Sequence, residues 1–255
     1  MGRESRESIE RLRAALRRRF PTAHGAVRSP PGPGLPTGIP ALDEVLRGGG
    51  FLPGTVVEVA GAPSSGKTAL ALAAVAAATG GRALAAWIDG EGTFFAPTAA
   101  GAGIALDRLL VLRPSPGREG LAAALRAVDE ILRSASFPLV VLDAGRHAAE
   151  IPGPALIRFE RAARESRAVL IVLAECPTDG TPLAATALIR LYVERIAVGW
   201  EGLSEHAAGI GRIRTAIHIR KGADPPRFGC TSGNVRSRLP VHGPVEIEVV
   251  LEAEP

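Results

Sequence analysis

Residues 56–72 read Val56-Val57-Glu58-Val59-Ala60-Gly61-Ala62-Pro63-Ser64-Ser65-Gly66-Lys67-Thr68-Ala69-Leu70-Ala71-Leu72, and this stretch decides the fold. The mainly apolar segment 56–59 predicts a strand, and the Ala/Leu-rich segment after residue 68 predicts a helix. The glycines between them allow a tight turn that aims several backbone N–H groups at one point. The helix presents its positive N-terminal end to the same point. The stretch therefore predicts a strand–loop–helix unit that binds phosphate.

The loop predicts ATP and Mg²⁺ as cofactors. Lys67 would reach the β- and γ-phosphates, and the Thr68 hydroxyl would ligate Mg²⁺. Of 30 lysines and arginines in the chain, only Lys67 and Lys221 are lysines. A phosphate-loop lysine acts as a compact point charge that the planar guanidinium does not mimic. The nucleotide-binding residues expected from the loop are Gly61, Ala62, Pro63, Ser64, Ser65, Gly66, Lys67 and Thr68.

Composition favours a globular, cytoplasmic protein. The 255 residues can bury one core with a small appendage, and 46% of them are hydrophobic. No apolar run is long enough to span a bilayer, and the charged N-terminus lacks the apolar region of a signal peptide. Two cysteines make neither a disulfide framework nor a zinc site. The net charge of +4 allows weak, non-specific DNA binding without requiring it.

The N-terminal segment is predicted to be a separate element. Residues 4–20 fit an amphipathic helix whose apolar face carries Ile9, Leu12, Leu16 and Phe20. A Pro/Gly-rich linker at 29–34 separates it from the rest. We expect a helix and linker at 1–28 and a nucleotide-binding core at 29–255. The helix could dock on its own core or on a neighbouring molecule, and we favour self-association or partner docking.

Strands and helices are expected to alternate after the linker. Uniformly apolar strands such as 139–142 and 168–173 belong to a parallel sheet that is covered on both faces. This alternation predicts a doubly wound α/β fold. Three later segments alternate in polarity and predict half-exposed, antiparallel strands at the C-terminal end. Expected strands lie at 55–60, 83–88, 109–112, 139–143 and 168–173, helices at 67–79, 95–102, 118–134 and 151–166, and later strands at 189–196, 212–219 and 245–249.

Two carboxylates follow predicted strands at the edge where open α/β sheets bind ligands. Asp143 closes the strand at 139–142 and is the candidate Mg²⁺ residue, acting through a water; it could instead cap the next turn. Glu91 follows the strand at 83–88 and is the candidate catalytic residue that polarises the attacking water. It could also be an exposed loop carboxylate. Asp89 is expected to be structural.

The chain resembles the RecA recombinase family over residues 35–230. The stretches 37–43 and 48–54 lead into the phosphate loop as in a RecA-type core. The resemblance places the water-activating glutamate at Glu91 and the Walker B strand at 139–143. It also implies that Lys221, in the stretch 220–226, reaches a neighbouring subunit's nucleotide, so that a homo-oligomer is expected.

Departures from RecA narrow the resemblance. The segments 143–168 and 175–189 leave little room for the two long DNA-binding loops, and Glu175 stands where RecA has a γ-phosphate-sensing glutamine. The large C-terminal domain is missing. These features resemble the ImuA family, RecA-like accessory proteins of the bacterial mutasome in SOS mutagenesis. The resemblance implies, as partners, an ImuB-like Y-family polymerase homologue, an error-prone replicative-type polymerase and RecA.

Two other functions stay open. One is a DNA-dependent recombination or motor ATPase of the RecA, RadA or KaiC type, whose ATP hydrolysis single-stranded DNA should accelerate. The other is a nucleotide-gated regulator that binds neither DNA nor polymerase subunits. The residues alone leave open whether the site hydrolyses ATP or only binds it.

Overall fold

The computed structural model describes residues 34–46, 48–115, 118–176, 183, 189–201, 209–221, 239–240 and 246–253. The helix expected at 4–20 lies outside these residues. The division of the chain into 1–28 and 29–255 therefore stays a prediction.

Among the described residues, the strands form one sheet in the order β3-β2-β4-β5-β1-β6-β7-β9-β8. Neighbours from β3 to β6 pair in parallel. The strands β1, β2, β4 and β5 are mainly apolar because both of their faces are covered. The strands are β1 (Val56–Gly61), β2 (Ala85–Asp89), β3 (Leu109–Leu112), β4 (Leu139–Gly145), β5 (Val169–Glu175), β6 (Ile189–Glu201), β7 (Gly209–Lys221), β8 (Leu239–Pro240) and β9 (Glu246–Ala253).

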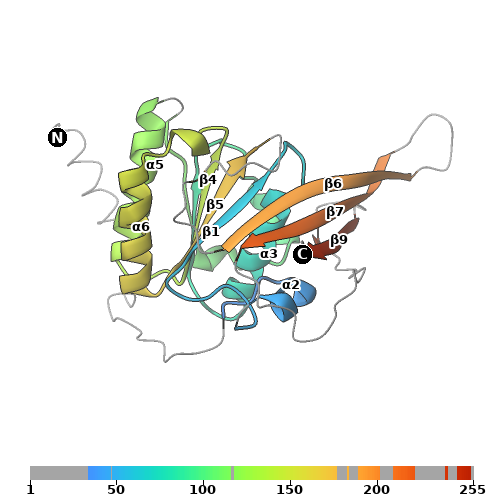
Figure 1. Cartoon of the computed structure of the whole chain (residues 1–255), viewed down its shortest axis with the longest axis horizontal. Coiled ribbons are helices and arrows are strands. Elements are labelled where there is room, and N and C mark those ends of the chain that lie inside the picture. Colours follow the sequence, from blue (N-terminus) through green and yellow to red (C-terminus); the bar gives the residue numbers. More distant parts are fainter. Residues whose placement is uncertain are drawn as a thin grey trace.

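Successive residues of the central strands pack into two different cores. Val141 and Ile171 join the core on the α3 side, whereas Val140 and Leu170 join the core on the α5 and α6 side. Figure 1 shows α5 and α6 on one face of the sheet and α3 on the other. The helices are α2 (Pro40–Val45), α3 (Lys67–Gly80), α4 (Ala96–Gly101), α5 (Arg118–Arg133) and α6 (Gly153–Ser166), with 3-10 turns at Leu106–Arg108 and Ala148–Glu150.

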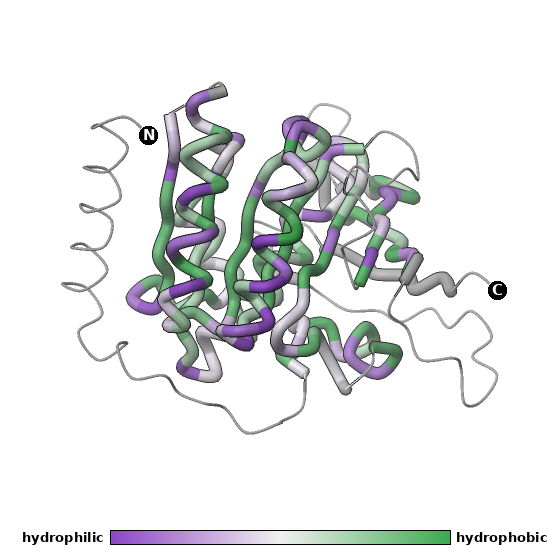
Figure 2. Tube along the Cα trace, turned by 60° about the vertical axis from the view of Figure 1, so that its left-hand side comes forward, coloured by the Kyte–Doolittle hydropathy of each residue, from purple (hydrophilic) through white to green (hydrophobic). Residues whose placement is uncertain are grey.

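The predicted doubly wound, mostly parallel fold is confirmed. Each strand and helix expected before residue 176 is present, with ends that differ from the prediction by no more than two residues. Figure 2 shows hydrophobic strands behind helices that carry hydrophilic residues along their outer sides. No helix among the described residues is long and apolar enough to cross a membrane.

The C-terminal strands agree with the prediction in part. β7 pairs antiparallel with β6, as expected for consecutive strands joined by a short connection. β9 pairs parallel with β7 and antiparallel with β8, so the antiparallel expectation for 245–249 holds on one side only. β6 pairs parallel with β1, so the antiparallel expectation for 189–196 holds only toward β7. The chain between β7 and β9 is long enough for a crossover, and β9 therefore enters the sheet from the same end as β7.

Candidate functional site

The loop between β1 and α3 is held in a conformation that exposes its backbone. Ser64 has φ 57° and Gly66 has φ 104°, both in the left-handed region. Such turns point consecutive N–H groups inward and form a cradle for an anion. Ser65 N–H donates to Ala62 O at 3.2 Å and closes the turn. A Cβ on Gly66 would also lie only 3.1 Å from Thr215 Oγ1, which explains the glycine there.

A residue of β7 is hydrogen-bonded to the loop. Thr215 is buried, and its hydroxyl donates to Ser65 O at 3.1 Å. This contact joins residues 150 positions apart and connects the loop to the C-terminal part of the sheet. Sequence reasoning missed Thr215, because a threonine in a strand of alternating polarity gives no local signal for such a contact.

The charges of three carboxylates act on Lys67. Its side chain is buried, and Nζ donates to Ala62 O at 3.1 Å. Burial lowers the pKa of Lys67, while the negative charges of Glu175, Asp143 and Glu91 act in the opposite direction. These carboxylates come from the carboxyl ends of β5, β4 and β2, which are neighbours in the sheet. The structure thus brings Glu91 and Asp143 together with the loop.

Asp143 is buried in β4, directly opposite Asp89 of β2 in the strand register. Its Oδ2 accepts a hydrogen bond from Thr93 Oγ1 at 3.3 Å. Burial, followed by the charge of Asp89, raises the pKa of Asp143 to about 6, and Glu91 contributes in the same direction. A buried carboxylate with negative neighbours gains from a bound cation, so this position suits a divalent metal.

Asp89 has the structural role that the sequence predicts. Its fully buried carboxylate accepts hydrogen bonds from the backbone N–H groups of Thr93 at 2.9 Å and Phe94 at 3.1 Å. Arg113 adds a contact from Nε and another from Nη2, each at 2.8 Å. Asp89 therefore fixes the turn that carries Glu91. Sequence reasoning missed Arg113 as its partner.

Glu91 is half-buried, so it is not a fully exposed loop carboxylate. Its Oε1 is buried and has no hydrogen-bond partner in the described part of the chain. Ser65 Oγ of the loop is another buried oxygen without such a partner. Buried polar atoms without a partner are uncommon, and a bound ligand or water usually supplies the missing hydrogen bond. Both atoms therefore fit a site that is completed by phosphate and water.

The structure describes the side chains of the remaining loop residues, but only the backbone of Lys221. Pro63, Ser64 and Thr68 are exposed, with Thr68 in the first turn of α3. Lys221 is the last residue of β7 and is opposite Arg190 in the register. Its side chain is not among the described parts, so its predicted role stays a prediction.

A charged residue also interrupts the apolar strand that leads into the loop. Glu58 of β1 is almost fully buried and accepts a hydrogen bond from Leu183 N–H at 3.1 Å. Arg190 Nε of β6 lies 3.4 Å from Glu58 Oε2. The pair offsets the cost of burying each charge. The sequence could not reveal it, because its partner lies on a strand far along the chain.

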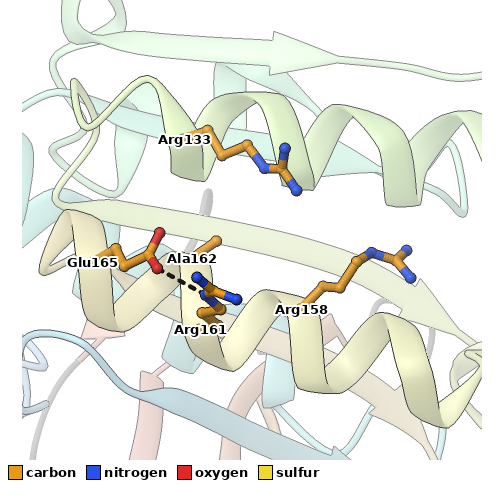
Figure 3. Close-up of a pocket in the computed structure, with 5 residues that line it drawn as sticks. All are labelled: Arg133, Arg158, Arg161, Ala162 and Glu165. Atoms are coloured by element: carbon orange, nitrogen blue, oxygen red, sulfur yellow. Dashed lines mark hydrogen bonds and ion pairs between the residues drawn. The ribbon is translucent and has the colours of Figure 1, made fainter.

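A separate hollow lies between α5 and α6 (Figure 3). Its lining includes Arg133, Arg158, Arg161, Ala162 and Glu165. The arginines are paired: Arg161 Nε donates to Glu165 Oε1 at 2.8 Å, and Arg158 Nε donates to Asp129 Oδ2 at 3.3 Å. The Arg158–Asp129 pair joins α6 to α5, whereas the Arg161–Glu165 pair lies within α6. The hollow shares no residue with the phosphate-binding loop.

The fold and this site together define the P-loop class of nucleotide-binding α/β proteins. Residues 31–198 match the family described as the RecA N-terminal domain, and the chain belongs to this RecA-like ATPase family.

Individual relatives support the assignment. The chain is 32% identical to Protein RecA of Frankia alni, over 78% of this chain and 64% of that protein. It is 30% identical to Protein RecA of Picosynechococcus sp., over 76% of this chain and 62% of that protein. Identity rises to 40% with Protein RecA of Corynebacterium urealyticum, over 47% of this chain and 31% of that protein. The chain thus spans just under two thirds of the length of the first two relatives.

Proposed function

We propose that the chain binds ATP with Mg²⁺ at the loop 61–68 and acts as an accessory protein in error-prone translesion DNA synthesis. Nucleotide binding is supported above all by the cradle-shaped loop and its buried Lys67, on which the charges of Glu175, Asp143 and Glu91 act. One ammonium among three carboxylates leaves an excess of negative charge, and a divalent cation would offset it.

Each residue of the site has a chemical task in this proposal. The Lys67 ammonium neutralises β- and γ-phosphate oxygens, and the backbone N–H groups of the loop hold the phosphates in place. Thr68 and Asp143 would hold Mg²⁺, with Asp143 acting through a water. Mg²⁺ would supply charge that stabilises the transferring phosphoryl group. Glu91 orients and polarises the attacking water, so the site is equipped for slow ATP hydrolysis.

The accessory role is supported by the short segment that stands where RecA has a long DNA-binding loop. The stretch between Asp143 and Ala168 holds only a 3-10 turn and α6, which packs on the sheet. We infer an ImuA-like protein that links an ImuB-like Y-family polymerase homologue to an error-prone replicative-type polymerase, with RecA as a further partner.

Substitution of Lys67 tests the nucleotide site. Lys67→Ala should weaken ATP binding, measured by calorimetry with Mg²⁺, by at least about a hundredfold, because a desolvated charge-assisted contact is lost. Lys67→Arg should also bind poorly, since a planar guanidinium does not fit the loop. Thermal unfolding checks that both variants fold. Full ATP affinity in Lys67→Ala would contradict the assignment.

The accessory role is tested on the same proteins. Purified wild type should retain the ImuB-like partner in the presence of ATP, and Lys67→Ala should retain less. Single-stranded DNA should leave wild-type hydrolysis within about twofold. Strong stimulation of hydrolysis by DNA, without retention of the partner, would favour the motor ATPase instead.

A further inference from the structure

Glu91 is held by packing on the strand-end backbone of β4. Its Oε1 is buried without a hydrogen-bond partner among the described residues. Asp89 accepts hydrogen bonds from the backbone of Thr93 and Phe94. These contacts fix the backbone after Glu91 but do not touch its side chain. A carboxylate that is not held by hydrogen bonds must be placed by the atoms against which it lies.

Those atoms belong to Gly145, the last residue of β4. A Cβ on Gly145 would overlap the Cγ, Cδ and Oε1 atoms of Glu91. Gly145 has φ 47°, a left-handed conformation that side chains disfavour. The bare Cα of Gly145 is therefore the surface on which the Glu91 carboxyl group rests.

A β-bulge gives Gly145 this position. Asp143 pairs with Leu173 of β5, and Gly145 pairs with Ala174, so Ala144 is an extra residue in β4. A bulge bends its strand and re-aims the residues that follow it. The bulge lies between Asp143, the candidate metal residue, and Gly145, against which the Glu91 carboxyl group packs.

A second glycine brings the two strand ends together. Gly90 N–H donates to Asp143 O at 3.0 Å. A Cβ on Gly90 would overlap that carbonyl oxygen. The turn after β2 can therefore approach the end of β4 only because residues 90 and 145 both lack side chains.

We propose that Gly145 is a positioning residue: with the β4 bulge it forms a seat that sets where the Glu91 carboxylate meets the attacking water. This inference rests on the proposed nucleotide-binding function. It assigns the bulge a catalytic purpose that lies beyond nucleotide binding itself.

The test compares Gly145→Ala with a matched glycine. Gly103 has φ 85° and open space where a Cβ would be, so Gly103→Ala introduces the same kind of backbone strain without a collision. Gly145→Ala should keep MgADP affinity within about twofold. Its affinity for MgADP with aluminium fluoride, which mimics the transferring phosphoryl group, should fall at least about tenfold, and any ATP turnover should fall with it. Gly103→Ala should change none of these.

Shortening the displaced side chain provides a rescue. In the Gly145→Ala background, Glu91→Asp removes one methylene and should recover at least about threefold of the lost analogue affinity. In the Glu91→Gln background, Gly145→Ala should cause little further loss, because the group that it displaces is already inactive. A loss as large in that background as in the wild type would overturn the proposal.

Stability gives a readout that needs no nucleotide. The denaturant midpoint lowered by Gly145→Ala should rise when Glu91 is also truncated to Ala, because the colliding atoms are then absent. If Glu91→Ala does not raise the midpoint of Gly145→Ala, the proposed role of Gly145 is overturned. Unchanged turnover and analogue affinity in Glu91→Gln would also overturn it, while leaving MgADP binding as support for the proposed function. A wild type that binds no nucleotide would instead refute the proposed function.

Discussion

At Asp143, burial and negative neighbours act in the same direction. Both oppose the charged carboxylate, and the pKa is raised from 3.8 to about 6. The folded chain therefore holds this proton more tightly than the unfolded chain does. The free energy of unfolding should fall as the pH rises from about 4 through about 6, and the cost should persist at higher pH. Asp143 thus lowers stability at neutral pH in the absence of a cation.

Removing this charge should stabilise the fold. Asp143→Asn should raise the free energy of unfolding at pH 8 by about 2 kcal/mol, since the raised pKa corresponds to at most about 3 kcal/mol. The gain should vanish below about pH 4. Urea unfolding at several pH values, without nucleotide or Mg²⁺, measures it. Asp107→Asn is the control, because the Asp107 side chain is 78% exposed. Equal stability of Asp143→Asn and wild type at pH 8 would contradict this account.

Among the elements, β7 has the least obvious task. It contributes Thr215 to the underside of the phosphate-binding loop, although it is two strands away from β1 in the sheet order. The loop therefore depends on a strand that follows it by about 150 residues.

The Thr215 hydroxyl should be needed for full nucleotide affinity. Thr215→Val keeps the shape of the side chain but removes the donor to Ser65 O. Loss of one buried hydrogen bond costs about 1 kcal/mol, or roughly fivefold in affinity if the loop distorts. Thr215→Ser should restore most of it. ATP affinity in Thr215→Val that equals that of wild type would show that β7 only packs beneath the loop.

Local sequence patterns were enough for the strands and helices before residue 176. Glycine spacing and apolar runs predicted β1, the loop and α3, and the positions of Glu91 and Asp143 after their strands placed them at one edge of the sheet. Partners that come from distant strands could not be predicted, because no pattern links Thr215 to Ser65 or Glu58 to Arg190. The parallel pairings of β9 with β7 and of β6 with β1 could not be predicted for the same reason, since a crossover leaves no periodic signal.

At the scale of the whole molecule, assembly is expected to depend on the segment 4–20. Its predicted apolar face carries Leu12 and Leu16, and the following linker would let the helix reach another molecule. Homo-oligomers and docking on polymerase partners are both consistent with the proposed function.

Charge on that face should reduce the assembled mass. Leu12→Asp combined with Leu16→Asp should shift sedimentation toward the monomer, because burying unpaired carboxylates at an interface is costly. Arg17→Asp combined with Arg18→Asp, on residues outside the apolar set, is the control for added negative charge. The same species for wild type and the leucine variant, with and without ATP, would show that this segment is not an assembly element.

The central position of β1 in the sheet affects how the region around the loop unfolds. β1 is hydrogen-bonded to β5 on one side and to β6 on the other, so the loop begins in the middle of the sheet. No fraying of an edge strand can release it. We therefore expect the amide protons of β1 to be among the slowest to exchange with solvent, through global unfolding alone. A ligand held by this loop would then protect the entire domain against unfolding, in proportion to the logarithm of its concentration.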